Sequence, residues 1–79
     1  MQQNLQHEIV AVIRDVGNLN GDIPPEKDLY AELGVESVNS IHILLALEEK
    51  FAISIDDTLF VQARTVNKLT DLVRDIRGN

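Results

Sequence analysis

The chain has 79 residues, a net charge of −6 and 44% hydrophobic residues, which indicates one small folded domain spanning 1–79 rather than a disordered segment. The absence of cysteine excludes disulfides, thiolate zinc sites and a thiol nucleophile, and the acidic charge argues against nucleic acid as a partner. The apolar runs are too short for membrane insertion, and the first residues lack the pattern of a signal peptide, so we expect a cytoplasmic monomer.

Negative charge is concentrated in the middle of the chain. Residues 22–57 hold nine acidic and two basic side chains, whereas residues 58–79 hold two acidic and four basic ones. A concentrated field of one sign accelerates the encounter with a partner of opposite sign. The middle segment is therefore expected to face a basic partner, unless its charge serves solubility alone.

The N-terminal segment reads as a helix followed by a long loop. Apolar residues at helical spacing predict a helix over 4–16, with Asn4 as its cap and Gly17 as its end. The following residues are rich in Gly, Asn and Pro and predict a loop up to residue 36, with one short turn over 28–33. Leu29 and Leu33 are expected to attach that turn to the core.

A second helix is predicted over 37–51, and its apolar residues cover most of its circumference. Such a helix either packs against the rest of the protein on two sides, or packs on one side and leaves the other exposed for a partner. The side predicted to face the core holds Ile41, Leu44, Leu47 and Phe51; the adjacent, more exposed side holds Val38, His42, Leu45 and Glu49.

The rest of the chain predicts two more helices. Residues 52–55 read as an extended connector, because a lone strand has nothing to pair with. Asp56 or Asp57 can cap a short helix over 57–63, and Thr65 can cap a last helix over 65–77 that ends at Gly78. The expected fold is all-α: a four-helix bundle of three longer helices and one short helix, with a long first loop.

No arrangement of residues predicts self-contained catalysis. His7 and His42 lie on different helices without a third ligand, so no metal site is expected. Glu48 and Glu49 are adjacent on a helix and diverge, so they do not form a catalytic pair. A small hydrolase using Ser37 would need a base that the sequence does not position, and we therefore do not expect an enzyme.

Ser37 stands at the predicted start of the second helix. One interpretation is an ordinary N-cap, in which the hydroxyl accepts a backbone hydrogen bond. The other is an attached phosphate, because free N–H groups and the positive end of the helix dipole stabilise an anion at that place. The residues alone leave both open.

The segment Leu29-Tyr30-Ala31-Glu32-Leu33-Gly34-Val35-Glu36-Ser37-Val38 resembles an acyl carrier protein. Members of that family have a four-helix bundle and a Gly-x-Asp-Ser-Leu motif. Leu47-Glu48-Glu49-Lys50-Phe51 and Thr65-Val66 stand at family-like spacing from it. The resemblance covers residues 5–76.

The resemblance implies a carrier of acyl groups rather than a catalyst. Ser37 would receive 4′-phosphopantetheine from a phosphopantetheinyl transferase, and the thiol of that group would hold an acyl chain as a thioester. Partners would be the transferase and the loading and chain-modifying enzymes of fatty-acid, polyketide or related biosynthesis, through their basic patches. The implied docking residues are Glu36, Val38, Ile41, His42, Leu45, Glu48 and Glu49.

Several positions depart from the family pattern. Glu36 replaces the usual Asp before the serine, and Val38 replaces the usual Leu after it. Asn39 and His42 stand where fatty-acid carriers usually have acids. These differences favour a specialised carrier, and two alternatives stay open: a stand-alone aminoacyl or peptidyl carrier loaded by an adenylating ligase, and an unmodified helical interaction module.

Overall fold

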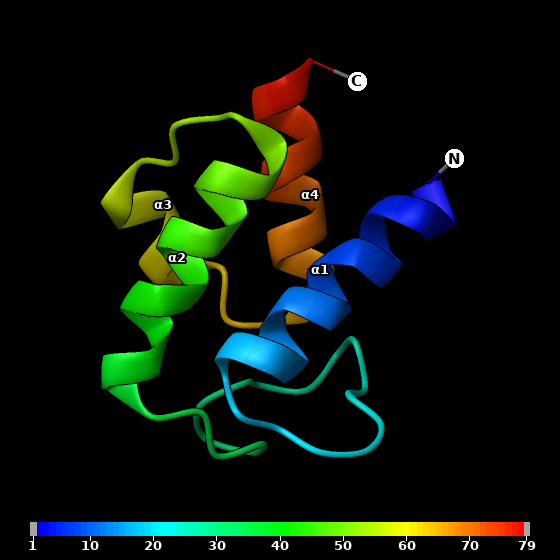
Figure 1. Cartoon of the computed structure of the whole chain (residues 1–79), viewed down its shortest axis with the longest axis vertical. Coiled ribbons are helices and arrows are strands. Elements are labelled where there is room, and N and C mark those ends of the chain that lie inside the picture. The colour runs from blue at the N-terminus through cyan, green and yellow to red at the C-terminus, as the bar shows by residue number, and fades with distance from the viewer. Residues whose placement is uncertain (1, 79) are drawn as a thin grey trace.

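The fold is a bundle of four helices in a computed structural model that describes residues 2–78 (Figure 1). The helices are α1 (Gln2–Val16), α2 (Ser37–Phe51), α3 (Asp57–Gln62) and α4 (Val66–Arg77), and the described part of the chain contains no strand. The all-α expectation is confirmed. No helix within residues 2–78 has the length and apolar character needed to cross a membrane. The first and last residues of the predicted domain, Met1 and Asn79, lie outside the described residues.

Helix α1 ends at Val16 as predicted but begins earlier than predicted. It begins at Gln2, so Asn4 lies within the helix and cannot be its cap. At the other end the N–H of Gly17 donates to the Ile13 carbonyl at 2.7 Å, but the left-handed residue that turns the chain away is Asn18, with φ of 60°. Gly17 has a different requirement: a Cβ there would lie 2.5 Å from the Ile13 carbonyl oxygen.

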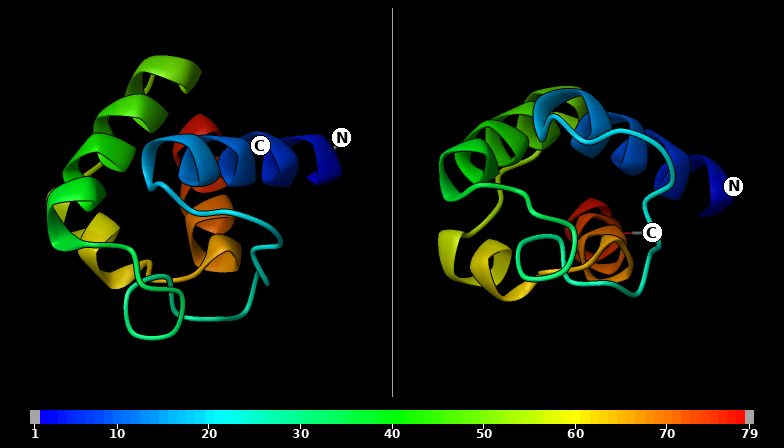
Figure 2. Two further views of the ribbon diagram at one scale, coloured as in Figure 1. Left: turned by 60° about the horizontal axis from the view of Figure 1, so that its bottom comes forward. Right: turned by 90° about the horizontal axis from the view of Figure 1, so that it is seen from below.

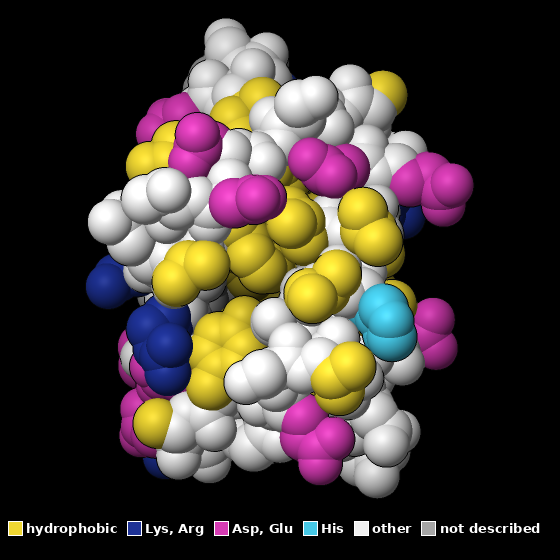
Figure 3. All heavy atoms as spheres, turned by 90° about the vertical axis from the view of Figure 1, so that its left-hand side faces the viewer, with side chains coloured by type: hydrophobic (Ala, Val, Ile, Leu, Met, Phe, Trp, Pro, Cys, Tyr) yellow, Lys and Arg dark blue, Asp and Glu magenta, His cyan; other side chains and the backbone are white. Residues whose placement is uncertain are grey.

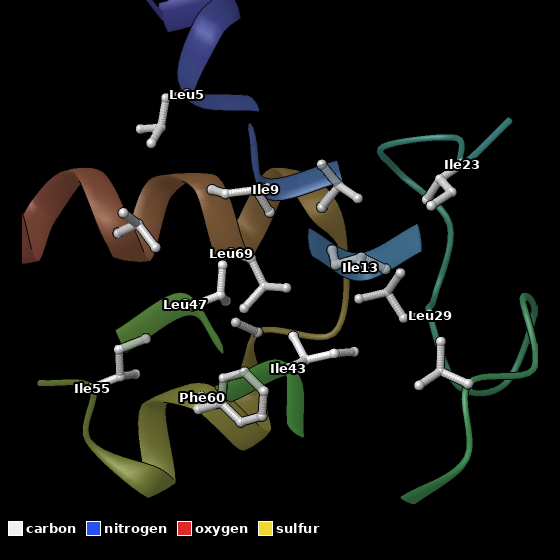
Figure 4. Close-up of a cluster of buried hydrophobic side chains, with 14 residues drawn as sticks. Leu5, Ile9, Ile13, Ile23, Leu29, Ile43, Leu47, Ile55, Phe60 and Leu69 are labelled. Carbon is white, nitrogen blue, oxygen red and sulfur yellow. The ribbon is translucent and has the colours of Figure 1, made fainter. Parts of the chain in front are cut away.

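The core lies where α1, α2 and α4 meet, and α1 packs against both of the others (Figure 4). Apolar residues at helical spacing on each helix give it one buried stripe. α3 and the connecting segments complete the cluster from the sides. The fully buried side chains are Ile9, Ile13, Leu29, Ile43, Leu47, Val66, Leu69 and Val73.

The buried side of α2 differs from the predicted one. Ile43 and Leu47 are fully buried, whereas Ile41 is 58% exposed. Leu44 and Phe51 are only partly buried. The prediction for Ile41 was wrong because apolar residues surround most of this helix, so that their spacing does not single out one face; packing against α1 turns Ile43 inward instead.

The long connection between α1 and α2 crosses the lower end of the bundle (Figures 1 and 2). Backbone hydrogen bonds attach it to the junction between α3 and α4: the Leu29 N–H donates to the Arg64 carbonyl at 2.8 Å, and the Asn67 N–H donates to the Pro25 carbonyl at 3.0 Å. Leu29 is fully buried and Leu33 is partly buried. The connection therefore closes the core from below and brings residues 28–30 beside residue 64.

Side-chain caps begin the last two helices. The Asp56 carboxylate accepts the N–H groups of Thr58 and Leu59, and the Thr65 hydroxyl accepts the N–H of Lys68. Gly78 ends α4 in the left-handed conformation. Residues 53–56 between α2 and α3 form neither helix nor strand, after a left-handed Ala52 that ends α2.

Candidate functional site

Ser37 is the first residue of α2 and is exposed. The capping position belongs to the preceding residue, Glu36, whose side chain makes no cap hydrogen bond. The Glu36 carbonyl accepts the N–H groups of Asn39 at 2.9 Å and Ser40 at 3.2 Å. The interpretation of Ser37 as an N-cap is therefore wrong. No hydrogen bond to another described residue involves the Ser37 hydroxyl.

The start of α2 is suited to an anion. The N–H groups of Ser37 and Val38 have no acceptor among the described residues, and the first turn of this 15-residue helix carries no acidic side chain. Unpaired N–H groups at the positive end of a helix dipole stabilise negative charge. A phosphodiester on the exposed Ser37 hydroxyl fits this place without displacing a protein contact.

An open groove of about 560 Å³ runs from Ser37 between α2 and α3 (Figure 3). Its α2 wall contains Ser40, Ile41 and Leu44, and its α3 wall contains Phe60 and Val61, with Asp57 also lining it. Figure 3 shows apolar side chains gathered around a hollow on this face, with basic side chains at one border. The groove therefore offers an apolar surface directly beside the candidate attachment point.

Tyr30 and Arg64 line the same groove. The Arg64 guanidinium carbon lies 4.8 Å from the centre of the Tyr30 ring, and the guanidinium donates from Nε to Asp28 Oδ2 at 2.6 Å and from Nη2 to Asp28 Oδ1 at 3.2 Å. The Arg64 hydrogen bonds, together with the N–H of Ala31, lower the pKa of Asp28 from 3.8 to about 2. Burial raises the pKa of the Tyr30 hydroxyl.

The outward side of α2 is apolar along its middle and acidic toward its ends. Val38, Ile41 and Leu45 are 59%, 58% and 56% exposed. Large apolar side chains this exposed on a single helix are characteristic of an interaction surface. The exposed polar side chains among the predicted docking residues are Glu36, His42 and Glu49.

Glu48, the remaining predicted docking residue, has a structural contact. Its Oε2 accepts the backbone N–H of Ile55 at 2.8 Å, and the side chain is partly buried. The bond holds the connector between α2 and α3 against the end of α2. Glu48 therefore differs from its neighbour Glu49, which is exposed and has no such bond.

The other candidates in the sequence do not form a site. His7 lies on α1 and His42 on the outward side of α2. Within residues 2–78, no three side chains of His, Cys, Asp or Glu gather closely enough to hold a metal ion.

The groove contains residues that sequence reasoning missed. Four of its residues were not singled out: Tyr30, Phe60, Val61 and Arg64. The spacing of apolar residues indicates the buried stripe of each helix, but it does not show which two helices leave a groove between them. Arg64 lies in the short link between α3 and α4, where no pattern distinguishes it from a solvated arginine. Apolar residues flank Phe60 on both sides in a helix of only six residues. Three consecutive apolar residues in so short a helix were the available signal for an exposed apolar face.

Residues 7–73 match the protein family described as "Phosphopantetheine attachment site". The acyl carrier protein of Helicobacter pylori (strain G27) is 33% identical over 76 residues, which are 95% of this chain and 94% of that protein. The chain belongs to the acyl carrier protein family. The chloroplastic acyl carrier protein 4 of Arabidopsis thaliana is 29% identical over 66 residues, which are 82% of this chain and 48% of that protein.

A solved structure shows the same fold. A provisionally assigned acyl carrier protein from Mycobacterium tuberculosis superposes with a TM-score of 0.82 at 22% identity, covering 90% of this chain and 96% of that one. Members of the acyl carrier protein family carry a covalently attached phosphopantetheine group and act as carriers together with biosynthetic enzymes and a phosphopantetheinyl transferase. The expectation of this family and of its prosthetic group is confirmed.

Proposed function

We propose that Ser37 receives the phosphopantetheine group and that the chain carries an acyl cargo on it. The observation that carries this proposal is the exposed Ser37 hydroxyl, free of any capping bond, at the start of α2 beside two unpaired N–H groups. A phosphate joined to that oxygen would lie at the positive end of the helix dipole.

In the proposed modification the Ser37 oxygen forms a bond to the phosphorus that bears the pantetheine part of coenzyme A. The bond from that phosphorus to the nucleotide breaks, the nucleotide leaves, and the hydroxyl proton passes to a base of the transferase or to water. The chain contributes the positioned hydroxyl and the N–H groups of Ser37 and Val38. When attached, the group supplies a thiol that holds the cargo as a thioester.

We favour an acyl chain over an amino acid as the cargo. The groove that begins at Ser37 has apolar side chains on both long walls, from Ile41 and Leu44 on one side and Phe60 and Val61 on the other. Burial of apolar surface favours a hydrocarbon chain in such a groove. This supports a carrier for fatty-acid, polyketide or related specialised biosynthesis, with the aminoacyl carrier as the alternative.

The outward side of α2 is the proposed docking surface for partner enzymes. Its exposed apolar residues, Val38, Ile41 and Leu45, would contact an apolar patch, and Glu36 and Glu49 would pair with basic residues of the partner. His42 stands among these residues and reduces the negative charge of the surface relative to a fatty-acid carrier.

The attachment is tested by incubating the chain with coenzyme A and a broad-specificity phosphopantetheinyl transferase and weighing the intact protein. The expected result is a gain equal to one phosphopantetheine group, lost in Ser37→Ala. Ser40→Ala is the matched control, because Ser40 lies one turn further along α2 and its hydroxyl donates to the Ser37 carbonyl at 2.6 Å; this variant should gain the same mass. No gain in the parent chain, or a gain that persists in Ser37→Ala, would contradict the proposal.

A further inference from the structure

We propose that Arg64 positions the pantetheine arm by donating hydrogen bonds to one of its oxygen atoms, either a phosphodiester oxygen or an amide carbonyl. The inference rests on the proposed attachment at Ser37. It assigns a role to a residue outside α2 and outside the docking surface. Its basis is the place of Arg64 in the groove, the contacts that hold its guanidinium and the donors that those contacts leave free.

Arg64 lines the groove that begins at Ser37, and among the described residues it is the one basic residue that lines this groove. Asp57, an acid, lines the same groove. In this space Asp57 repels an anionic oxygen, whereas Arg64, although its charge is paired with the Asp28 carboxylate, attracts an oxygen through the N–H groups that Asp28 leaves free. The electrostatics of the groove therefore direct the oxygen atoms of an arm on Ser37 toward the end formed by Tyr30 and Arg64.

The Arg64 guanidinium is held in one orientation before any ligand arrives. Asp28 accepts two of its hydrogen bonds, and the Tyr30 ring lies against one of its faces. Asp28 is itself fixed, because its Oδ1 also accepts the N–H groups of Tyr30 and Ala31, each at 2.8 Å. A planar, pre-oriented guanidinium loses little conformational entropy on binding.

Donors remain for a ligand after these contacts are made. A guanidinium has five N–H groups in a fixed fork, and Asp28 takes two of them. No other described residue accepts a side-chain hydrogen bond from Arg64, and the side chain is 46% exposed. The remaining N–H groups can therefore bind an oxygen that enters from the groove.

Arg77 provides a matched comparison. Its guanidinium carbon lies 5.4 Å from the centre of the Phe51 ring, so it makes the same kind of stacking contact at the end of α4. Arg77 does not line the groove. A general effect of losing one stacked arginine should appear in both variants, whereas an effect on the arm should appear only at Arg64.

The test is NMR of the modified chain carrying an isotopically labelled arm. In the parent, attachment should shift the Arg64 Nη–H resonances, because the free donors are on the Nη atoms while Nε–H donates to Asp28. An arm amide should show an order parameter above about 0.6, the range of restrained groups. In Arg64→Gln the order parameter should fall below that value, and in Arg77→Gln it should not change. A change in the ³¹P resonance between the parent and Arg64→Gln would identify the phosphodiester as the acceptor; a change in an arm amide would identify its carbonyl.

Two results would overturn the inference: Arg64 Nη–H resonances that do not move on attachment, or an arm equally mobile in the parent and in Arg64→Gln. The first needs only the parent chain, so it decides the matter even if the variant fails to fold. A chain that gains no mass with the transferase would instead overturn the attachment at Ser37, and with it this inference. A modified chain with a freely moving arm would overturn the role of Arg64 alone.

Discussion

At the scale of single residues, two adjacent acids of α2 have different roles. Glu48 accepts the Ile55 N–H, whereas Glu49 is exposed. Glu48→Ala should lower the free energy of unfolding by about 1–3 kcal/mol, because a charge-assisted hydrogen bond is lost and a partly buried donor is left unpaired. Glu49→Ala removes the same charge and should stay within about 0.5 kcal/mol of the parent. Urea denaturation measures both, and equal effects would show that the Glu48 bond contributes nothing to stability.

The Asp28 carboxyl predicts a dependence of stability on pH. Its pKa in the folded chain is about 2, against 3.8 for an ordinary aspartate, mainly because of its hydrogen bonds to Arg64 and to the Ala31 N–H. A pKa lowered by folding contributes stability above the unfolded value, and that contribution is lost as pH falls toward the folded one. The parent should therefore be more stable than Asp28→Asn near neutral pH, and the difference should shrink between about pH 4 and pH 2. Thermal unfolding across that range checks this; a constant difference would contradict it.

At the scale of helices, the sequence predicts more reliably which helices form than which side of each helix is buried. The apolar stripes of α1 and α4 are narrow, and Ile9, Ile13 and Leu69 on these stripes are fully buried. α2 has apolar residues around most of its circumference, and its orientation depends on contacts with other helices that spacing does not contain. The same lack of long-range information explains why the groove and its Arg64 were missed, although the start of α2 at Ser37 was predicted correctly.

The orientation of α2 can be tested by making the same substitution, isoleucine to alanine, at two positions of the helix. Ile43 is fully buried and Ile41 is 58% exposed, two residues apart on the same helix. Ile43→Ala should lower the free energy of unfolding by about 2–5 kcal/mol, because it leaves a cavity in the core. Ile41→Ala changes the same atoms on the surface and should cost far less. Chemical denaturation of the two variants measures the difference, and a larger loss for Ile41→Ala would restore the orientation that the spacing predicts.

At the scale of the whole molecule, the fold separates stability from recognition. α1 packs against α2 on one side, and the side turned away from α1 carries exposed apolar residues together with the groove at Ser37 (Figure 3). Substitutions on the outward side should therefore alter partner binding without unfolding the chain. The same arrangement places the proposed attachment point and the proposed docking surface on one helix, so that a partner bound to α2 would face the cargo.

Docking through this surface should depend on both apolar contact and charge. Leu45 is 56% exposed, and Leu45→Ser should lower kcat/KM of a phosphopantetheinyl transferase by about tenfold, since truncating an interface anchor costs more than about 1 kcal/mol. Glu49→Lys should also lower kcat/KM and make it less sensitive to salt, because an attraction that salt screens is replaced by repulsion. Initial rates at several salt concentrations, with melting temperatures as a check on folding, measure both effects. Unchanged rates in Leu45→Ser would show that the transferase docks on another surface of the chain.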